Sequence, residues 1–295
     1  MSKLTARERK KRRDGYFLIA PAIILLIITF AGPLLYSFLI SMSDAQSVIA
    51  NDIKLVGFDN YISVLKAPRF QGALLHTCFF VVTTLFFEFL IGFVVAMLLH
   101  KQSPGFRIYK LIFAIPLMVA PVVSGLQWRW MFADQYGVIN HLLSQLGIDP
   151  PLWLTTANGS WVAIIVANLW LATPFVILVL LAGLGGLSEE MNEAAEIDGA
   201  NKWQVFRHII LPQLKPTILI ILVIRITDAF RIYDLVYILT GGGPGGKTEV
   251  LSTYIYKRIF TDWEFGKGAA ASFMVMILIS VISFICNRLM REKED

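Results

Sequence analysis

Four charged residues recur at every third position of one apolar stretch of this chain. They are Arg225, Asp228, Arg231 and Asp234. On insertion scales, an Arg or Asp in the middle of a membrane helix costs about 2.5–3.5 kcal/mol. The deeper charges should therefore face other protein segments or a water-filled path, and neighbours of opposite sign three residues apart can pair along a helix. Two interpretations stay open: a structural ion-pair ladder, which could also bond a partner subunit, or the polar lining of a transport path.

A second segment looks like a nucleotide-binding loop but lacks the necessary context. Residues 241–248 read GGGPGGKT and satisfy the pattern G-x-x-x-x-G-K-[ST]. A phosphate-binding loop needs a buried strand before it and, after it, a helix whose N-terminus holds the phosphate. Here an apolar run of membrane-spanning length precedes the segment. We therefore interpret it as a flexible, glycine-rich turn on the outer side of the membrane.

Residues suited to covalent or metal chemistry are not gathered anywhere in the sequence. The four histidines are scattered, and Cys78 and Cys286 both lie inside apolar runs, where a cysteine usually serves packing. No Ser/His/Asp set and no metal-ligand spacing is present. We predict that the chain has no catalytic residues, no metal site and no cofactor of its own, and that it is not an enzyme.

The composition is typical of a membrane protein. Of the 295 residues, 56% are hydrophobic and only 16% are charged, and the mean hydropathy is +0.66. A helix needs about 20 apolar residues to cross a bilayer, and helices are expected because each buried backbone amide must bond within its own segment. We predict an all-α fold with six spans, near residues 16–41, 74–99, 108–131, 160–185, 217–239 and 269–289.

Lys and Arg residues lie mainly on one side of the predicted spans. They are frequent before the first span, after the second, after the fourth and after the sixth, whereas residues 132–159 contain none; the last outer loop is an exception. This distribution predicts that both termini are cytoplasmic, and it accounts for the pI of about 9.2 without nucleic-acid binding. The predicted organisation is a basic tail (1–15), the first span with an outer loop (16–73), a core (74–290) that contains a cytoplasmic loop (188–216), and a short tail (291–295).

The most informative segment is the polar break between the fourth and fifth predicted spans. Residues 193–216 read EAAEIDGANKWQVFRHIILPQLKP, a pattern that predicts two short helices. Ser188 can cap the first helix, and Gly199 can supply the left-handed residue that ends it. Asn201 and Gln204 form a capping-box pattern for the second helix.

Proline residues are expected to interrupt or bend helices. Pro212 is expected to stop the second helix of the loop, and Pro216 to open the fifth span. Five more prolines lie inside predicted spans, where they would bend helices, either to pack a bundle or to act as hinges for alternating access. These are Pro21, Pro33, Pro116, Pro121 and Pro174.

The loop resembles the EAA loop of ATP-binding-cassette importer permeases, in which EAA is followed after three residues by Gly, and an apolar helix then ends in Leu-Pro and a second Pro. The matching residues here are Glu193, Ala194, Ala195, Asp198, Gly199, Ala200, Phe206, Ile209, Leu211, Pro212 and Pro216. The resemblance implies that the loop docks into a groove of a cytoplasmic ATPase subunit. Glu193 would meet a basic group there, and Gly199 would set the angle between the two helices. Without the resemblance, the same residues would be interpreted as a surface helical hairpin.

The resemblance also implies a fold and a set of partners. The fold is that of a type I importer permease with six transmembrane helices, located in a bacterial inner membrane. The expected partners are a second homologous permease chain, two copies of a cytoplasmic ATP-binding subunit and an extracytoplasmic sugar-binding protein, with ATP and Mg held by the ATPase. The string Leu239–Pro244 resembles a stretch common in the carbohydrate-importing branch, so the expected substrate is a sugar or a sugar derivative.

In such permeases, the helices before and after the EAA loop build a sugar site in the middle of the membrane. At the corresponding distances from Glu193 lie Leu171, Ala172, Phe175, Arg225, Asp228, Ala229 and Ile232. Under this interpretation the charges line the sugar path, and two arginines would suit an anionic sugar. The alternatives are a permease for a sugar phosphate or a polyol, and an ion-driven secondary transporter in which the loop has no docking role.

Overall fold

The computed structural model describes residues 6–46, 54–100, 106–187, 191, 195 and 197–291. Throughout these residues the chain is helical apart from turns and one antiparallel β-bridge, between Ser43 and Leu55. Four helical segments are long and apolar enough to cross a membrane, or up to six if each of two bent pairs counts as one span. The predicted all-α fold is confirmed, and six spans are consistent with this result.

The chain divides into two compact units, of which the first comprises residues 1–65 and 257–274. Its elements are α1 (Ala6–Leu26), a π-helical turn (Ile27–Ala31), α2 (Gly32–Ser41), α3 (Asp59–Lys66) and the beginning of α15 (Phe265–Arg291). The span Gly15–Ser41 is helical throughout. The wider π turn joins α1 to α2, and Pro33 lies in the first turn of α2. Beyond α2, the buried Asn60 side chain donates hydrogen bonds to the carbonyls of Ser41 (2.9 Å) and Ser43 (2.7 Å).

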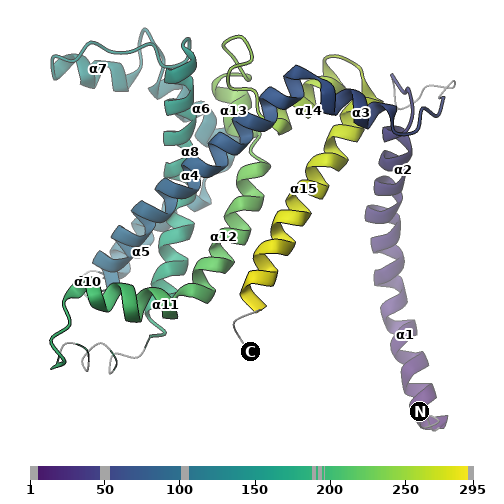
Figure 1. Cartoon of the computed structure of the whole chain (residues 1–295), viewed down its shortest axis with the longest axis horizontal. Helices are drawn as coiled ribbons and strands as arrows, with labels where there is room; N and C mark the ends of the chain where they lie inside the picture. Colours follow the sequence, from purple (N-terminus) through teal and green to yellow (C-terminus); the bar gives the residue numbers. More distant parts are fainter. Residues whose placement is uncertain are drawn as a thin grey trace. The chain divides into compact units, whose positions relative to one another are not determined.

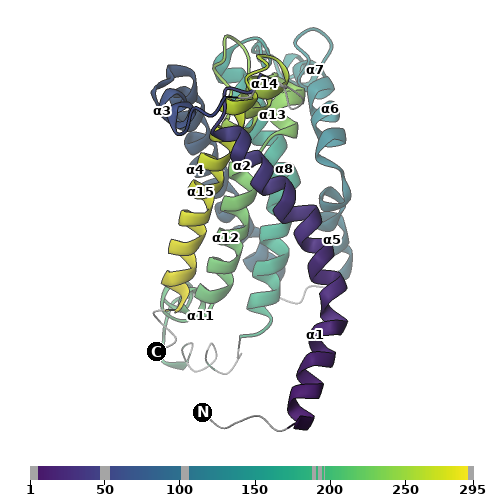
Figure 2. The ribbon, with the colours of Figure 1, turned by 90° about the vertical axis from the view of Figure 1, so that its right-hand side faces the viewer.

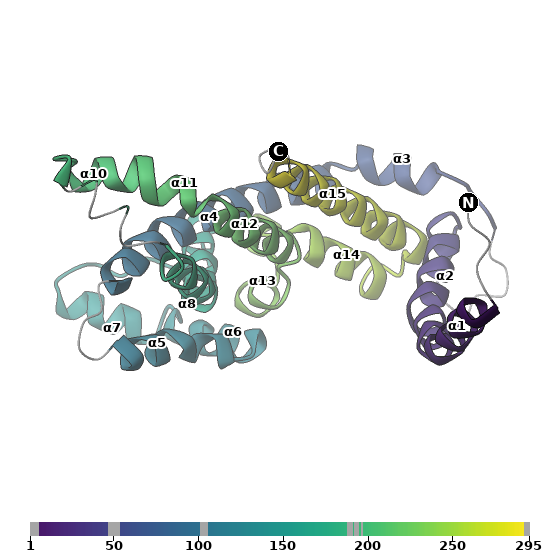
Figure 3. The same cartoon turned by 90° about the horizontal axis from the view of Figure 1, so that it is seen from below.

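The second unit comprises residues 66–256 and 275–295. Its elements are α4 (Pro68–His100), α5 (Phe106–Ala114), a 3-10 turn (Ile115–Met118), α6 (Pro121–Met131), α7 (Val138–Gln145), α8 (Ala157–Leu184), α10 (Lys202–Val205), a π turn (Phe206–Ile210), α11 (Leu211–Gln213), α12 (Lys215–Phe230), α13 (Asp234–Leu239), most of α14 (Leu251–Phe260) and the end of α15. In this unit α4, α8 and α12 pack against one another (Figures 1 and 2). Seen from below, α8 lies between the α5–α6 pair and the α4–α12 pair (Figure 3).

Close backbone approach holds this bundle together. Lipid tails are as apolar as leucine, so helices in a membrane associate mainly through packing, which small residues at the contact favour. A Cβ atom at Gly92 of α4 would lie only 2.7 Å from the Cγ1 atom of Val176 on α8. A Cβ atom at Gly183 would lie 2.9 Å from atoms of both Leu214 and Thr217. Glycine at these two positions lets α8 approach α4 on one side and the start of α12 on the other.

The third predicted span, 108–131, is correct in extent but is sharply bent. Residues Ile108–Met118 and Pro121–Met131 meet at an angle of 95°. The break falls at Val119 and Ala120, whose ψ angles of 127° and 137° are extended. Proline disfavours the helical conformation in the residue before it, so the following Pro121 accounts for the extended Ala120. The segment is therefore a broken span or a re-entrant loop rather than a straight helix.

The loop after α8 confirms two local predictions and differs from a third by one residue. Gly199 has a φ of +81°, the predicted left-handed conformation. Asn201 and Gln204 form the predicted capping box, in which each side chain accepts a hydrogen bond from the other residue's backbone N–H (2.9 and 2.8 Å). Pro212 was predicted to stop this helix; the helix ends one residue later, at Gln213, where the chain bends by 66° into the next helical segment. The π turn before α11 leads into a first α-helical turn that contains the proline, where a missing N–H is tolerated.

The fifth predicted span, 217–239, is also interrupted. Pro216 lies in the first turn of α12, as predicted, but α12 ends at Phe230 and α13 begins only at Asp234. The break is preceded by two short-range hydrogen bonds, in which the N–H groups of residues 231 and 232 bond to carbonyls three residues earlier. The Ile232 carbonyl then accepts a hydrogen bond from the Ser252 hydroxyl of α14.

Candidate functional site

A cavity of the second unit lies where helices are interrupted. It has a volume of about 320 Å³. Leu117 and Pro121 border it from either side of the break between α5 and α6, and Ile232 and Tyr233 border it from the break between α12 and α13. Phe175, directly after a proline within α8, forms another part of the wall. Interrupted helices at membrane depth are tolerated only where they are buried in protein or line a water-filled cavity, and this cavity fits that rule.

The structure brings six of the seven proposed path residues together around this cavity. These are Leu171, Ala172, Phe175, Arg225, Asp228 and Ile232. The seventh, Ala229, is 2% exposed and packs in the apolar core with Phe80, Ile164 and Val236. It therefore supports the wall without lining it.

A buried ion pair fixes one side of the cavity. The Arg225 guanidinium donates two hydrogen bonds to the Glu88 carboxylate of α4, from Nε to Oε2 (2.9 Å) and from Nη2 to Oε1 (3.0 Å). Asn168 of α8 donates from Nδ2 to the same Oε1 atom at 3.0 Å. Glu88 is fully buried, and Arg225 is 8% exposed. One network therefore links three helices, and it satisfies a charge that would otherwise be very costly in the bundle.

The sequence interpretation missed Glu88. The residue lies inside the predicted span 74–99, where it is the only charged residue. An ionisable residue within a span is by default a functional-site hypothesis, because it needs a buried partner. That rule would have pointed to Glu88, but only the structure identifies Arg225 as its partner.

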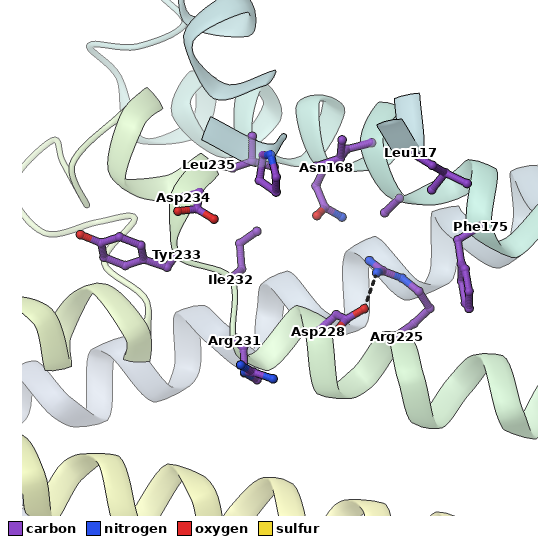
Figure 4. Close-up of a pocket in the computed structure, with 13 residues that line it drawn as sticks. Leu117, Asn168, Phe175, Arg225, Asp228, Arg231, Ile232, Tyr233, Asp234 and Leu235 are labelled. Atoms are coloured by element: carbon purple, nitrogen blue, oxygen red, sulfur yellow. Dashed lines mark hydrogen bonds and ion pairs between the residues drawn. The ribbon is translucent and has the colours of Figure 1, made fainter. Parts of the chain in front are cut away.

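The four charged residues near the end of α12 do not form one continuous ladder. Arg225 Nη1 pairs with Asp228 Oδ2 at 3.2 Å, so pairing at a spacing of three residues is present there (Figure 4). The helix break separates Arg231 from Asp234, and their side chains lie apart (Figure 4). The Asp228 side chain remains 55% exposed, and Arg231 is exposed as well. All four line the cavity, and two of them, Arg225 and Asp228, also form an ion pair.

The cavity also offers apolar surface. Leu117, Leu171 and Phe175 line it beside the charged groups. Figure 4 shows Phe175 at one end of the cavity and Tyr233 at the other, with Asp228 and Ile232 between them. A site of this kind can contact the apolar face of a solute while carboxylates and amides bond to its polar groups.

The structure describes only part of the proposed coupling residues. Glu193 and Ala194 lie outside the described residues, as does the predicted cap Ser188. Ala195, Asp198, Gly199 and Ala200 are described, and the Ala200 N–H donates to the Ala195 carbonyl at 2.9 Å. Both alanines pack against the apolar cluster at this end of α8.

Two large apolar side chains of the same loop face outward. Ile197 is 86% exposed and Trp203 is 64% exposed. The loop belongs to a polar break between apolar spans, where such exposure is not needed for contact with lipid. Apolar groups exposed outside the lipid are available for contact with another protein. The sequence interpretation did not single out either residue.

The glycine-rich segment 241–248 is a turn, as predicted, but hydrogen bonds and a buried Thr248 hold it in place, in contrast to the predicted flexible turn. It connects α13 to α14, and four of its glycines have positive φ angles. Thr248 is fully buried, and its hydroxyl donates to the Gly243 carbonyl at 2.6 Å. Directly after the turn, Glu249 forms a two-fold ion pair with Arg69 at the start of α4 (2.8 and 3.0 Å). The turn thus fixes the end of α13 to α4 and lacks the strand that a phosphate-binding loop follows.

Comparisons with known proteins agree with this architecture. The family model described as binding-protein-dependent transport system inner membrane component matches residues 66–292. The chain is 34% identical to the trehalose/maltose transport system permease protein MalF of Thermococcus litoralis, covering 100% of this chain and 98% of that protein. It is 31% identical to the trehalose transport system permease protein SugA of Mycobacterium tuberculosis, covering 97% of this chain and 91% of that protein.

A solved structure has the same fold. The crystal structure of a bacterial ABC transporter involved in the import of the acidic polysaccharide alginate contains a chain that matches with a TM-score of 0.83. The match covers 98% of this chain and 99% of the other at 23% sequence identity. A match of this extent confirms the predicted multi-span helical fold.

Proposed function

This chain belongs to the family of binding-protein-dependent transport system inner membrane components, and from that premise we propose that it forms half of the membrane path of an ATP-driven sugar importer. Membership of this family agrees with the prediction of a transport subunit rather than an enzyme, located in the inner membrane with several spans. The cytoplasmic position of both termini is part of the proposal and rests on the distribution of Lys and Arg.

One observation carries the sugar assignment: the cavity combines apolar walls with charges that balance. Its charged lining consists of two arginines and two aspartates, and Arg225 is already bonded to both Glu88 and Asp228. A neutral solute suits such a lining, because it adds no charge to a set of charges that sums to zero. Sugars have apolar ring faces for residues such as Phe175, and hydroxyls that can donate to the exposed Asp228 carboxylate. The names of two relatives, which refer to trehalose and maltose, support the same class.

The partners of the importer are a second homologous permease chain, two copies of a cytoplasmic ATP-binding subunit and an extracytoplasmic sugar-binding protein. ATP and Mg are held by the ATP-binding subunit, and this chain holds no cofactor. The loop 188–216 docks on that subunit, with Glu193 and Ala194 at its start and Gly199 at its turn. The outward-facing Ile197 and Trp203 support this role, because an apolar surface in a polar loop is suited to protein contact.

The alternatives have less support from the residues of the cavity. An anionic sugar or a sugar phosphate would need a free cation. Arg225 is committed to two carboxylates, so the anion would have to bind the exposed Arg231 in a lining that also contains two aspartates. A polyol offers hydroxyls but no ring face for the aromatic side chains. A secondary transporter would leave the loop without a partner and Ile197 without a contact.

The test begins with purification of the tagged chain from its native membranes in mild detergent. We expect an ATP-binding subunit and a second permease to copurify, and to be lost with Gly199→Pro. In proteoliposomes with the binding protein outside, the complex should take up at least one neutral sugar from a panel containing maltose and trehalose, only when ATP is enclosed. A chain that purifies alone, or uptake that follows an ion gradient without ATP, would overturn the proposal.

A further inference from the structure

Three tyrosines form a compact aromatic cluster beside the interrupted fifth span. The rings of Tyr233 and Tyr237 are stacked, with centroids 5.2 Å apart and an interplanar angle of 18°. Tyr256 of α14 lies 5.3 Å from both, tilted by 49° and 66°. We call these three residues the tyrosine cluster.

Two features hold the tyrosine cluster in place. Tyr233 and Tyr237 lie one turn apart, at the start of α13 and within it. Next to them, the Ser252 hydroxyl of α14 donates to the Ile232 carbonyl and so ties α14 to the helix break. The rings are therefore fixed before any ligand arrives, which reduces the entropy lost on binding.

The tyrosine cluster adjoins the cavity through Tyr233. Tyr233 is one of the residues that line it, at the end opposite Phe175 (Figure 4). Tyr237 is 42% exposed, so its ring offers a free surface next to that end. Asp234, which follows Tyr233 in the chain, also lines the cavity and brings a carboxylate to the same place.

We propose that the tyrosine cluster is an outer sugar-binding subsite, on which a neutral pyranose ring stacks before it enters the cavity. The inference rests on the proposed import of a sugar and adds a site that none of the seven path residues includes. A ring face of a pyranose carries C–H groups, which pack on an aromatic face, while its hydroxyls need acceptors such as Asp234. The tyrosine rings supply the flat apolar surface for this packing.

The test uses the complete complex in proteoliposomes and whichever sugar of the panel the wild-type complex takes up. Tyr237→Leu removes the exposed ring, Tyr237→Phe keeps it, and Tyr136→Leu is the control. Tyr136 is also exposed (67%) and pairs with another ring, that of Trp130, but it is not part of the tyrosine cluster. Stacking of this kind predicts a rise of about two- to tenfold in the sugar concentration at half-maximal uptake for Tyr237→Leu. We expect values within about twofold of wild type for Tyr237→Phe and Tyr136→Leu.

Several outcomes would overturn the subsite. Equal half-maximal concentrations for Tyr237→Leu and wild type would show that the ring does not contact sugar. An equal defect in Tyr237→Phe would mean that the hydroxyl acts, rather than the ring face. Loss of the second permease from Tyr237→Leu complexes would show a subunit contact instead. If the wild-type complex takes up no sugar from the panel, the proposed function itself fails, and the subsite fails with it.

Discussion

The two residues of the Glu88–Arg225 ion pair should differ in how much stability is lost when each is replaced. Replacing Arg225 by Gln leaves the fully buried Glu88 carboxylate with the Asn168 amide but without its cation. Replacing Glu88 by Gln leaves Arg225 paired with Asp228 at 3.2 Å, and Asp228 is half-exposed. The arginine substitution should therefore be the more damaging of the two.

The magnitudes follow from the burial of the pair. Removing one partner of a buried ion pair typically costs about 3–5 kcal/mol, because the other charge stays unpaired in a medium that solvates it poorly. We expect Arg225→Gln to lower the free energy of unfolding by an amount in that range. For Glu88→Gln we expect about 1.5–3 kcal/mol, the usual effect of losing hydrogen bonds to a charged group. The double variant carries neither charge, so its loss should be smaller than that of Arg225→Gln alone.

The assay is the denaturation midpoint of the purified complex in one detergent, measured for both single variants and the double variant as a mutant cycle. Lys267→Gln is the control, because its ion pair with Glu264 (2.7 Å) is 41% exposed on the lysine side and should contribute about 0–1 kcal/mol. Two results would refute the reasoning: an Arg225→Gln midpoint equal to that of the control, or a double variant whose loss equals the sum of the single losses.

Three further predictions concern close contacts and charge. Residue 199 has a φ of +81°, so Gly199→Ala should destabilise the native conformation of the loop by about 1–2 kcal/mol and reduce the recovery of the ATP-binding subunit. Asn adopts this conformation more readily, so Gly199→Asn should reduce the recovery less in the same copurification. Gly92→Ala should lower the denaturation temperature, since its Cβ would lie 2.7 Å from Val176 Cγ1, and adding Val176→Ala should restore part of the loss. Partial burial raises the pKa of Glu264, but the hydrogen bond with Lys267 and the neighbouring cations lower it by more. The pKa of this carboxyl therefore lies below its usual range. The stabilising contribution of the Glu264 carboxylate should be present at neutral pH and disappear as the pH falls through the lowered pKa. The difference in denaturation temperature between wild type and Glu264→Gln should therefore become smaller in acid.

Hydropathy and the positions of prolines predicted much of the fold. Every predicted span coincides with a helix or a bent helix pair, because length and apolar composition suffice to recognise a membrane helix. The capping box at Asn201 and the left-handed Gly199 were predicted because local chemistry determines both. The bend before Pro121 was foreseen as a bend, but its angle of 95° depends on what packs against each half.

The interruption of the fifth span could not be predicted in the same way. Residues 231–233 contain neither Gly nor Pro, and hydropathy does not distinguish a broken helix from a continuous one. What the break requires is a partner for the freed backbone groups, such as Ser252, which lies 20 residues away along the chain. Glu88 is a related case: its type could have been noted in the sequence, but its partner Arg225 is 137 residues away.

The two sides of this interruption are anchored to different helices, and this explains why the cavity lies there. Before the break, Arg225 fastens α12 to α4 through Glu88. After the break, Arg129 of α6 donates to the Ile238 carbonyl of α13 at 2.8 Å, and a Cβ atom at Gly125 of α6 would lie 3.2 Å from Ile238. A change of angle within 231–233 would therefore alter the opening of the cavity and leave both anchors intact. If the helix were continuous at this depth, the same change of angle would break backbone hydrogen bonds where no water can replace them. Each unsatisfied group would then cost several kcal/mol.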